Sequence, residues 1–334
     1  MRVRKSVLGV DKSVIDKAAS LDKYYTNDDA AAQCFGDLQL VLALLNYDCN
    51  LTHYLEPSAG GGAFVRAAEA DGQPIYPFDI VPEHDTVQQA DFINDPLRNL
   101  PDRRSLVTIG NPPFGTRGRL AAQFINIALD QYSDTVAFVL PIQFRKHLIQ
   151  KTLIPKAQLV FDKDLADDSF SFLGGSYSLR SCFQVWTTRE TDQPDLRLRK
   201  PPPVNHPDFE AWQYNNTRDA EKYFDKQKYQ WQFAVPRQGF YDYSIRETSP
   251  DAMSRKQQWI FLKAKSDVVF ERLWSLDYEQ LAKRNTVTPG FGKADLVDYY
   301  ESCYQSTTPE SEQLQRNWAR HFSRWATARA SLKA

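Results

Sequence analysis

One short segment, Gly110-Asn111-Pro112-Pro113-Phe114-Gly115, combines residue types that could do chemistry on an amine. It follows residues 106–109, whose apolar character predicts a buried strand. Two consecutive prolines hold the backbone extended, because each ring fixes its own φ and restricts the residue before it. The Asn111 amide oxygen and the Pro112 carbonyl could accept both hydrogens of an exocyclic amine, while Phe114 offers a ring face for stacking. Engaging both hydrogens leaves the nitrogen lone pair available, so the segment predicts a site that makes an aromatic amine nucleophilic.

A second segment is dense in glycine and predicts a ligand-binding turn. Leu55-Glu56-Pro57-Ser58-Ala59-Gly60-Gly61-Gly62-Ala63-Phe64 passes from a predicted strand through three glycines into a predicted helix. Consecutive glycines permit positive φ and let a ligand approach the backbone at the carboxyl end of the strand. The segment lacks the Gly-Lys-Ser/Thr ending of a phosphate loop, which disfavours a nucleoside triphosphate. Asp79 lies about 20 residues farther on, the spacing of a carboxylate that binds ribose hydroxyls in doubly wound folds.

These segments sit in a chain that alternates β-rich and helical runs between residues 53 and 189. The alternation is typical of a mostly parallel sheet with crossover helices, so it predicts an α/β fold with room for seven strands. The predicted strands cover residues 53–57, 75–80, 106–109, 135–140, 159–162 and 181–188, and the predicted helices cover residues 63–70 and 120–130. The alternating pattern of residues 181–188 predicts a strand at the edge of the sheet.

A change of composition predicts a domain boundary after the sheet. Residues 191–207 contain five prolines among polar residues, which favours an extended connector. We therefore expect a catalytic domain at residues 1–190, a proline-rich linker at residues 191–207 and a smaller C-terminal α+β domain at residues 208–334. Within the last part, the predicted strands are residues 231–235, 240–246 and 259–263, and the predicted helices are residues 267–284 and 294–304. A further predicted helix at residues 312–332 carries Arg316, Arg320 and Arg324 on one face.

Composition excludes several classes of protein. The chain has 334 residues, of which 42% are hydrophobic and 25% charged, so it can bury a sizeable core and is neither disordered nor fibrous. No apolar run approaches the roughly 20 residues of a membrane span, and no secretory signal follows the basic N-terminus. We therefore expect a cytoplasmic protein with no membrane association. The four cysteines form no close pair, which argues against a zinc site and a disulfide framework, and we expect no metal.

The segments together resemble those of a known family, the S-adenosylmethionine-dependent amino-methyltransferases that modify adenine N6 or cytosine N4 in DNA. The family's Asp/Asn/Ser-Pro-Pro-aromatic tetrad is similar to Asn111-Pro112-Pro113-Phe114, and its cofactor turn looks like the glycine-dense segment that begins at Pro57. Tyr24-Tyr25-Thr26 resembles the family's segment upstream of that turn, and Ala90-Asp91-Phe92 resembles its third cofactor element. The order of these elements is that of the γ subgroup, and the resemblance covers about residues 23–188.

The resemblance implies a Rossmann-like class I methyltransferase fold, S-adenosylmethionine as the cofactor and double-stranded DNA as the partner. The implied catalytic residues are Asn111, Pro112, Pro113 and Phe114. The implied cofactor contacts are Tyr25, Thr26, Glu56, Pro57, Ser58, Gly60, Gly62, Phe64, Asp79, Ile80, Asp91 and Phe92. Phe170 or Phe172 would form the far wall of a pocket for a flipped base, while Arg117 and Arg119 follow the tetrad closely enough to touch flanking phosphates.

The preferred function from sequence is therefore site-specific methylation of adenine N6 in DNA, with the C-terminal region recognising the target. Cytosine N4 methylation uses the same tetrad chemistry, and Asn followed by Phe favours adenine only through the resemblance. An RNA adenine-N6 methyltransferase is a second alternative, because the tetrad also resembles that of certain ribosomal RNA enzymes. A non-catalytic DNA-binding subunit is the third. We expect a nucleoid-associated monomer, and a cognate restriction endonuclease, if there is one, would be encoded separately.

Overall fold

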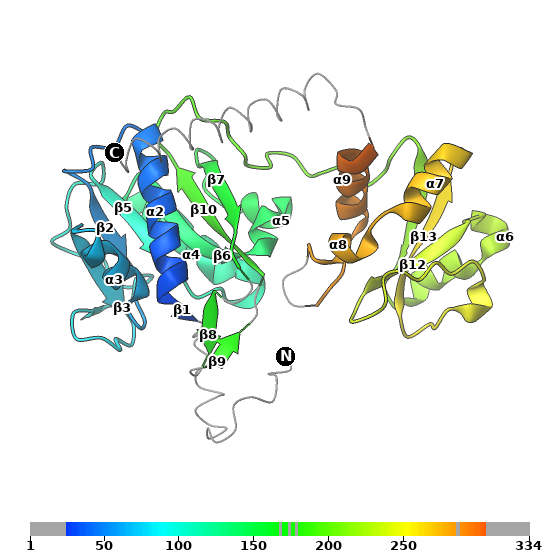
Figure 1. The fold of residues 1–334 in the computed structure, drawn as a ribbon, viewed down its shortest axis with the longest axis horizontal. Coiled ribbons are helices and arrows are strands. Elements are labelled where there is room, and N and C mark those ends of the chain that lie inside the picture. Colours follow the sequence, from blue (N-terminus) through cyan, green and yellow to red (C-terminus); the bar gives the residue numbers. More distant parts are fainter. Residues whose placement is uncertain (1–24, 167–168, 173–174, 178–179, 285–287, 305–334) are drawn as a thin grey trace. The chain divides into compact units, whose positions relative to one another are not determined.

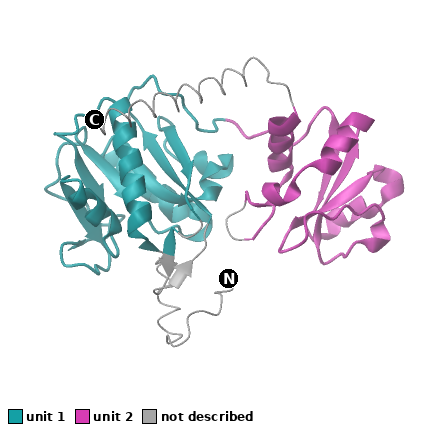
Figure 2. Cartoon of the chain, in the orientation of Figure 1, with its two compact units in different colours: residues 1–199, 314–334 teal, residues 200–313 magenta. Residues whose placement is uncertain are grey.

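The computed structural model describes residues 25–166, 169–172, 175–177, 180–284 and 288–304. Contacts divide the chain into two units between Arg199 and Lys200, and Figure 2 colours them separately. The predicted arginine-bearing helix at residues 312–332 lies outside the described residues. In the part of the chain that the structure describes, no helix is both long and apolar enough to cross a membrane.

Seven strands of the first unit form one sheet in the order β4-β3-β2-β5-β6-β10-β7 (Figure 1). Their bounds are β2 (His53–Glu56), β3 (Ile75–Asp79), β4 (Gln88–Gln89), β5 (Leu106–Gly110), β6 (Thr135–Pro141), β7 (Gln158–Asp164) and β10 (Ser181–Thr187). Strands β4, β3, β2, β5 and β6 pair in parallel, whereas β10 pairs antiparallel with both β6 and β7. This arrangement confirms the predicted Rossmann-like class I methyltransferase fold.

The prediction that residues 181–188 form an edge strand is wrong. β10 lies between β6 and β7, and all seven of its residues are buried. The polar residues of this strand, Ser181, Gln184 and Thr187, are buried together with the apolar ones, because β10 has a neighbouring strand on each side. The edge is instead β7, whose last residues are progressively more exposed.

Helices cover both faces of the sheet. Their bounds are α2 (Asp28–Leu44), α3 (Ala63–Ala70), α4 (Arg119–Ile127), which continues into a wider turn at Ala128–Tyr132, and the short α5 (His147–Gln150). The strand order runs outward from β2 in one direction and from β5 in the other, so right-handed crossovers place α3 and α4 on opposite faces. Helix α2 was not predicted from the sequence; it begins where the Asn27 side chain accepts a hydrogen bond from the Ala30 amide at 2.8 Å.

A small second sheet stands beside the carboxyl ends of the strands. It has the order β1-β8-β9, with β1 (Tyr25–Thr26), β8 (Phe170–Phe172) and β9 (Gly175–Tyr177). Thr26 pairs with Phe170, so the segment before α2 is held against a segment almost 150 residues later in the chain. Short 3₁₀ helices occur at Thr116–Gly118, Ile142–Arg145, Arg218–Phe224 and Pro250–Ala252.

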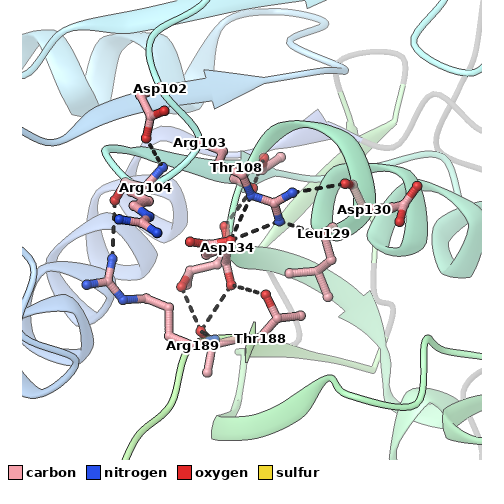
Figure 3. Close-up of polar contacts among 12 residues, drawn as sticks. Asp102, Arg103, Arg104, Thr108, Leu129, Asp130, Asp134, Thr188 and Arg189 are labelled. Carbon is pink, nitrogen blue, oxygen red and sulfur yellow. Dashed lines mark hydrogen bonds and ion pairs between the residues drawn. The ribbon is translucent and has the colours of Figure 1, made fainter.

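At the opposite end of the sheet, a polar cluster fixes the amino ends of the central strands (Figure 3). The Arg103 guanidinium donates to the Asp134 carboxylate at 2.9 Å and to the carbonyls of Leu129 and Asp130. Arg189 donates to the Arg104 carbonyl at 3.2 Å. These bonds tie the loop before β5 to the start of β6 and the end of β10, which leaves the carboxyl ends as the side available for a site.

The proline-rich segment is a linker only in its second half. Residues 191–199 pack on the first unit, where the buried Arg197 guanidinium donates to the carbonyls of Gln150, Leu153, Ile154 and Ala157 at 2.7 to 2.9 Å. The prediction of a connector over residues 191–207 is therefore wrong for its first nine residues. The reason is a long-range contact: four carbonyls of α5 and the turn that follows it converge on one arginine.

The second unit is an α+β module around a three-stranded antiparallel sheet. Its strands are β11 (Phe209–Tyr214), β12 (Phe233–Gln238) and β13 (Gln258–Ala264), in the order β11-β13-β12, and its helices are α6 (Lys226–Tyr229), α7 (Asp267–Ser275), α8 (Tyr278–Ala282) and α9 (Lys293–Tyr304). The central strand supplies Ile260 and Leu262 to one hydrophobic cluster and Trp259 and Phe261 to another, as its alternation requires.

Two predictions fail in this unit, and one strand was missed. Residues 240–246 form a turn, in which the Tyr243 hydroxyl donates to the Gly239 carbonyl at 2.8 Å. The predicted helix at residues 267–284 breaks at Leu276, whose backbone is extended, and Asp277 caps a new helix by accepting from the Gln280 amide. Strand β11 was not predicted, because the polar residues on its exposed edge conceal the pattern.

The Arg197 contact gives a stability prediction. Arg197→Met keeps the aliphatic volume but removes the charged hydrogen bonds to four carbonyls, so we expect the first unit to lose about 3 kcal/mol of unfolding free energy. Urea denaturation followed by circular dichroism measures the change. Lys200→Met, at an exposed position three residues later, is the matched control and should be neutral. Equal effects of the two substitutions would show that the arginine does not anchor the segment.

Candidate functional site

A cavity of about 600 Å³ lies at the carboxyl ends of the first unit's strands. It opens beside β2 and β5, the neighbouring strands from which the order of the sheet runs in opposite directions. Doubly wound folds bind ligands at this switch point, because the two loops there separate to opposite faces. Its walls comprise Tyr25, Thr26, Asn27, Asp28, Glu56, Pro57, Ser58, Ala59, Gly60, Gly61, Ala63, Phe64, Arg66, Asp79, Ile80, Ala90, Asp91, Phe92, Ile93, Asn94, Asn111, Pro113, Leu120 and Phe124.

The glycine turn forms the floor of this cavity. Gly60 has a φ of +49° and Gly62 a φ of +77°, and the Gly62 amide donates to the Ala59 carbonyl at 2.7 Å. A Cβ atom on Gly60 would lie 3.0 Å from the Tyr25 ring. Glycine is therefore needed at position 60 for its backbone conformation and for the close approach of the aromatic residue.

Asp79 fixes the turn from the end of β3. Its carboxylate accepts hydrogen bonds from the Gly60 amide and the Val81 amide, each at 2.8 Å. The sequence suggested this residue as a ribose acceptor, and the structure gives it a second task, since it also sets the conformation of the glycine turn. Each carboxylate oxygen can accept more than one hydrogen bond, so a ligand hydroxyl can be added without breaking these contacts.

Glu56 places a buried carboxyl group at the end of β2. It is 2% exposed, and its Oε2 atom has no hydrogen-bond partner among the described residues. Burial raises the pKa of this carboxyl well above its usual value, the negative charge of Asp79 raises it further, and Arg66 partly offsets the rise. This environment favours the protonated form of the group, which presents a donor and an acceptor to the cavity.

The Asn111 loop closes the other side of the cavity. Gly110 allows it to approach β2, since a Cβ there would lie 3.4 Å from the Glu56 side chain, and the Ser58 hydroxyl donates to the Asn111 carbonyl at 3.3 Å. Asn111 and Pro113 line the cavity, whereas Pro112 and Phe114 are buried behind it. The alternation follows from the extended backbone that the two prolines impose.

The position of Phe114 corrects the expectation that its ring is presented for stacking. Only 9% of the residue is exposed, and it belongs to the hydrophobic core of the first unit. Gly115, with a φ of +65°, then turns the chain so tightly that a Cβ would lie 2.6 Å from that of Leu120. In this structure Phe114 anchors the loop, and the ring face is not available at the cavity wall.

Residues before α2 form the near wall. The Tyr25 hydroxyl donates to the Glu83 carboxylate at 2.7 Å, and Arg66 pairs with Asp28 while donating to the Gly61 carbonyl at 2.6 Å. The Thr26 hydroxyl is buried and has no hydrogen-bond partner among the described residues. Burial and the neighbouring Glu83 raise the pKa of Tyr25, so its hydroxyl is protonated at neutral pH.

The far wall comes from the loop after β4. Asp91 accepts from the backbone amides of Ile93 and Asn94 and from the Asn94 side chain, and the last of these bonds is the main reason that the Asp91 pKa is lowered. The Phe92 ring packs 4.9 Å from that of Phe124, which closes the base of this wall. A carboxylate thus stands beside an aromatic surface at the place the sequence expected.

The cavity also includes residues that the sequence analysis missed. They are Asn27, Asp28, Ala59, Gly61, Ala63, Arg66, Ala90, Ile93, Asn94, Leu120 and Phe124. Asn27 had a recognisable signal, because an Asn before two aspartates is typical of a helix start. The position of Arg66 depends on the pairing of α3 with the start of α2, which no local pattern reveals.

Several predicted site residues lie away from the cavity wall. Gly62 shapes the turn without lining it, and Arg117 and Arg119 are exposed outside it. Phe170 is 1% exposed within the core, so the expectation that it could form a wall of the base pocket is wrong; pairing of β8 with β1 turns it inward. The side chain of Phe172 lies outside the described residues. Among the described residues, no group of three or more His, Cys, Asp or Glu side chains is arranged to hold a metal.

Comparisons with known proteins give distant structural neighbours only. No family model matches the chain, and no curated protein matches it in sequence. The restriction-modification enzyme MmeI, solved in complex with DNA, aligns with 96% of this chain and 70% of its own at 9% identity and a TM-score of 0.41. A provisionally assigned RNA methyltransferase from Pyrococcus horikoshii aligns with 51% of this chain and 88% of its own, at 16% identity and a TM-score of 0.39.

A third neighbour is the modification subunit of a provisionally assigned type I restriction enzyme from Vibrio vulnificus. It aligns with 85% of this chain and 62% of its own, at 11% identity and a TM-score of 0.36. At these scores the similarity indicates neither a reaction nor a substrate. The functional interpretation therefore depends on the strand order and the cavity.

The state of Glu56 gives a pH prediction. The pKa of Glu56 is higher in the folded state than in the unfolded state. Its stabilising contribution is therefore complete below the unfolded-state pKa. That contribution is lost as the pH rises toward the folded-state pKa. Wild-type unfolding free energy should therefore fall between pH 5.5 and 8 by up to about 1.4 kcal/mol per pH unit from this group. Glu56→Gln removes the titration and should flatten this dependence.

Denaturation at both pH values measures the effect, and Glu69→Gln, on the exposed side of α3, is the control that should keep the wild-type slope. If Glu56→Gln shows the same slope as wild type, the buried carboxyl does not titrate in this range.

Proposed function

We propose that this chain is an S-adenosylmethionine-dependent methyltransferase that methylates the exocyclic N6 of adenine in DNA. The observation that carries the proposal is the position of the Asn111-Pro112-Pro113 loop. It stands on the wall of the same cavity whose floor is the glycine turn, and the Ser58 hydroxyl joins the two. An amine acceptor and a nucleoside-sized cavity are thus adjacent.

The cavity wall fits the cofactor in its donors and acceptors. Asp79 would accept hydrogen bonds from the ribose hydroxyls, Asp91 would accept from the adenine amine, and Phe92 would contact the adenine ring. The buried polar atoms of Glu56 and Thr26 that have no partner among the described residues support a polar ligand here, because such atoms cost free energy unless a ligand pairs with them. Gly60 and Gly61 leave the backbone open to close approach. When bound, S-adenosylmethionine supplies a methyl group on a positively charged sulfur.

The loop residues would do the rest by positioning. The Asn111 side-chain oxygen and the Pro112 carbonyl orient the target amine by accepting its two hydrogens, which directs the nitrogen lone pair into the cavity. Gly110 and the buried Phe114 hold this loop rigid from below, so little conformational entropy remains to be lost on reaching the reactive geometry. The methylated amine then loses a proton to solvent or through Asn111.

Duplex DNA hides the amine inside the base stack, so the target adenine has to be extruded at a cost of a few kcal/mol. We assign recognition of the surrounding sequence to residues 208–334 and methyl transfer to residues 1–190. We expect the protein to act as a monomer, and a cognate restriction endonuclease would be a separate chain.

The reaction is tested by transfer of labelled methyl groups from S-adenosylmethionine to unmethylated duplex DNA and, in parallel, to structured RNA. Mass spectrometry of the digested nucleosides should find N6-methyladenine from the duplex. N4-methylcytosine would change the target base, label in RNA alone would change the substrate, and no label in either would contradict the proposed activity.

Asn111→Ala separates catalysis from cofactor binding. Because the side chain is assigned to the amine and not to the cofactor, we expect turnover to fall by roughly 100-fold or more while the affinity for S-adenosylmethionine changes little. Calorimetric titration and the methyl-transfer assay measure the two effects. Asn50→Ala, at an exposed position before β2, is the matched control. Equal loss of affinity and turnover would instead assign Asn111 a structural role.

A further inference from the structure

An exposed leucine stands next to the Asn111 loop. Leu148, in α5, is 70% exposed, although its neighbours Phe144 and Gln150 are almost fully buried. The turn that carries it follows β6, and the Asn111 loop follows β5, the adjacent parallel strand. Both turns therefore leave the same edge of the sheet.

The two turns are in direct contact. Gly118, four residues after Phe114, adopts a φ of +74°, and a Cβ there would lie 2.9 Å from the Phe144 ring and 3.4 Å from the Ile149 side chain. Glycine at this position lets the turn after the Asn111 loop pack closely against the base of α5. Leu148 thus has a fixed place beside the Asn111 loop.

The platform beneath Leu148 is rigid. The Gln150 side chain donates to the Phe144 carbonyl at 2.9 Å and accepts from the Leu198 amide at 2.7 Å. Arg197 donates to the Gln150 carbonyl at 2.7 Å. Because these bonds hold α5 from below, Leu148 cannot turn into the core, and its apolar surface remains exposed at an unfavourable free energy of hydration.

The surface around Leu148 is basic. Arg117, Arg119 and Lys151 are exposed in the same two turns, while Arg145 is held by Asp162 and Asp164 at 2.6 Å each. Arg145 is therefore occupied within the fold, whereas the three exposed cations belong to the two turns that pack together beneath Leu148. An exposed apolar side chain on a surface that also carries exposed cations suits duplex DNA, whose phosphates pair with the cations while the apolar group enters the base stack.

We infer that Leu148 inserts into duplex DNA and fills the space that the extruded target base leaves. The inference rests on the proposed function for its substrate and adds the residue that stabilises the opened duplex. Arg117, Arg119 and Lys151 hold the flanking phosphates in this arrangement. Insertion offsets part of the unstacking cost, because the vacated space is filled by apolar surface and not by water.

Binding to an abasic duplex tests insertion without requiring methyl transfer. Fluorescence anisotropy compares a 30-base-pair duplex with the same duplex carrying one abasic site, in the presence of S-adenosylhomocysteine. The intact duplex lacks a recognition sequence and is bound with its bases stacked, so the leucine meets a vacancy only in the abasic duplex, which wild type should bind about tenfold tighter. Leu148→Ala should reduce the preference to below about threefold while leaving affinity for the intact duplex unchanged.

Two variants separate insertion from other effects. Leu148→Met keeps an apolar side chain of similar volume and should retain the preference. Leu51→Ala removes a leucine that is 65% exposed before β2, at the opposite end of the strands, and should behave as wild type. Arg117→Gln with Lys151→Gln should weaken binding to both duplexes by the same factor and lower the salt dependence by about one unit per lost phosphate contact.

A wild-type protein without preference for the abasic duplex, or Leu148→Ala with the full preference, would overturn the insertion. Failure of the proposed reaction has a different signature, which is a Leu148-dependent preference in this assay together with no methyl transfer to DNA. Absence of duplex binding would overturn the insertion and the DNA substrate together.

Discussion

The contact between the ends of β2 and β5 is the constraint on which the site depends. Glu56 ends one strand and Gly110 ends the other, and the absence of a side chain on Gly110 lets the two backbones approach around a buried carboxyl group. The order of the sheet runs outward in both directions from this pair. The glycine turn and the Asn111 loop therefore begin side by side and then diverge, and the cavity is the space between them.

The groups around the cavity are held by one another before any ligand arrives. Asp79 fixes the glycine turn, Ser58 joins that turn to the Asn111 loop, and Tyr25 rests on Gly60. The polar cluster around Arg103 and Asp134 fixes the opposite ends of the strands. This preorganisation suits a reaction in which catalysis is mainly positioning, because the cost of ordering the reactive groups is met during folding.

The Asn111 loop and the proposed DNA surface belong to the same rigid part of the first unit. Arg197 anchors the turn that carries Leu148, and Gly118 lets that turn pack against the segment that follows Phe114. One rigid edge of the sheet thus carries both the group assigned to the amine and the group assigned to the vacated base position. In the proposed reaction, base extrusion and methyl transfer are separate costs, and separate residues on adjacent loops are assigned to them.

Local sequence patterns were enough to predict the strands and turns that hold the site. Predicted residues 63–70 coincide with α3, and predicted strands 75–80 and 106–109 differ from β3 and β5 by one residue at an end, because glycine, proline and apolar periodicity act over a few residues. Tertiary structure decided which of these residues face the cavity. These outcomes depend on partners far apart in the chain. They are the burial of Phe114 and Phe170, the pairing of Arg145 with Asp162, the position of β10 between two strands and the anchoring of residues 191–199 through Arg197. Local propensity carries no information on such partners, because their contacts form only when the sheet has assembled.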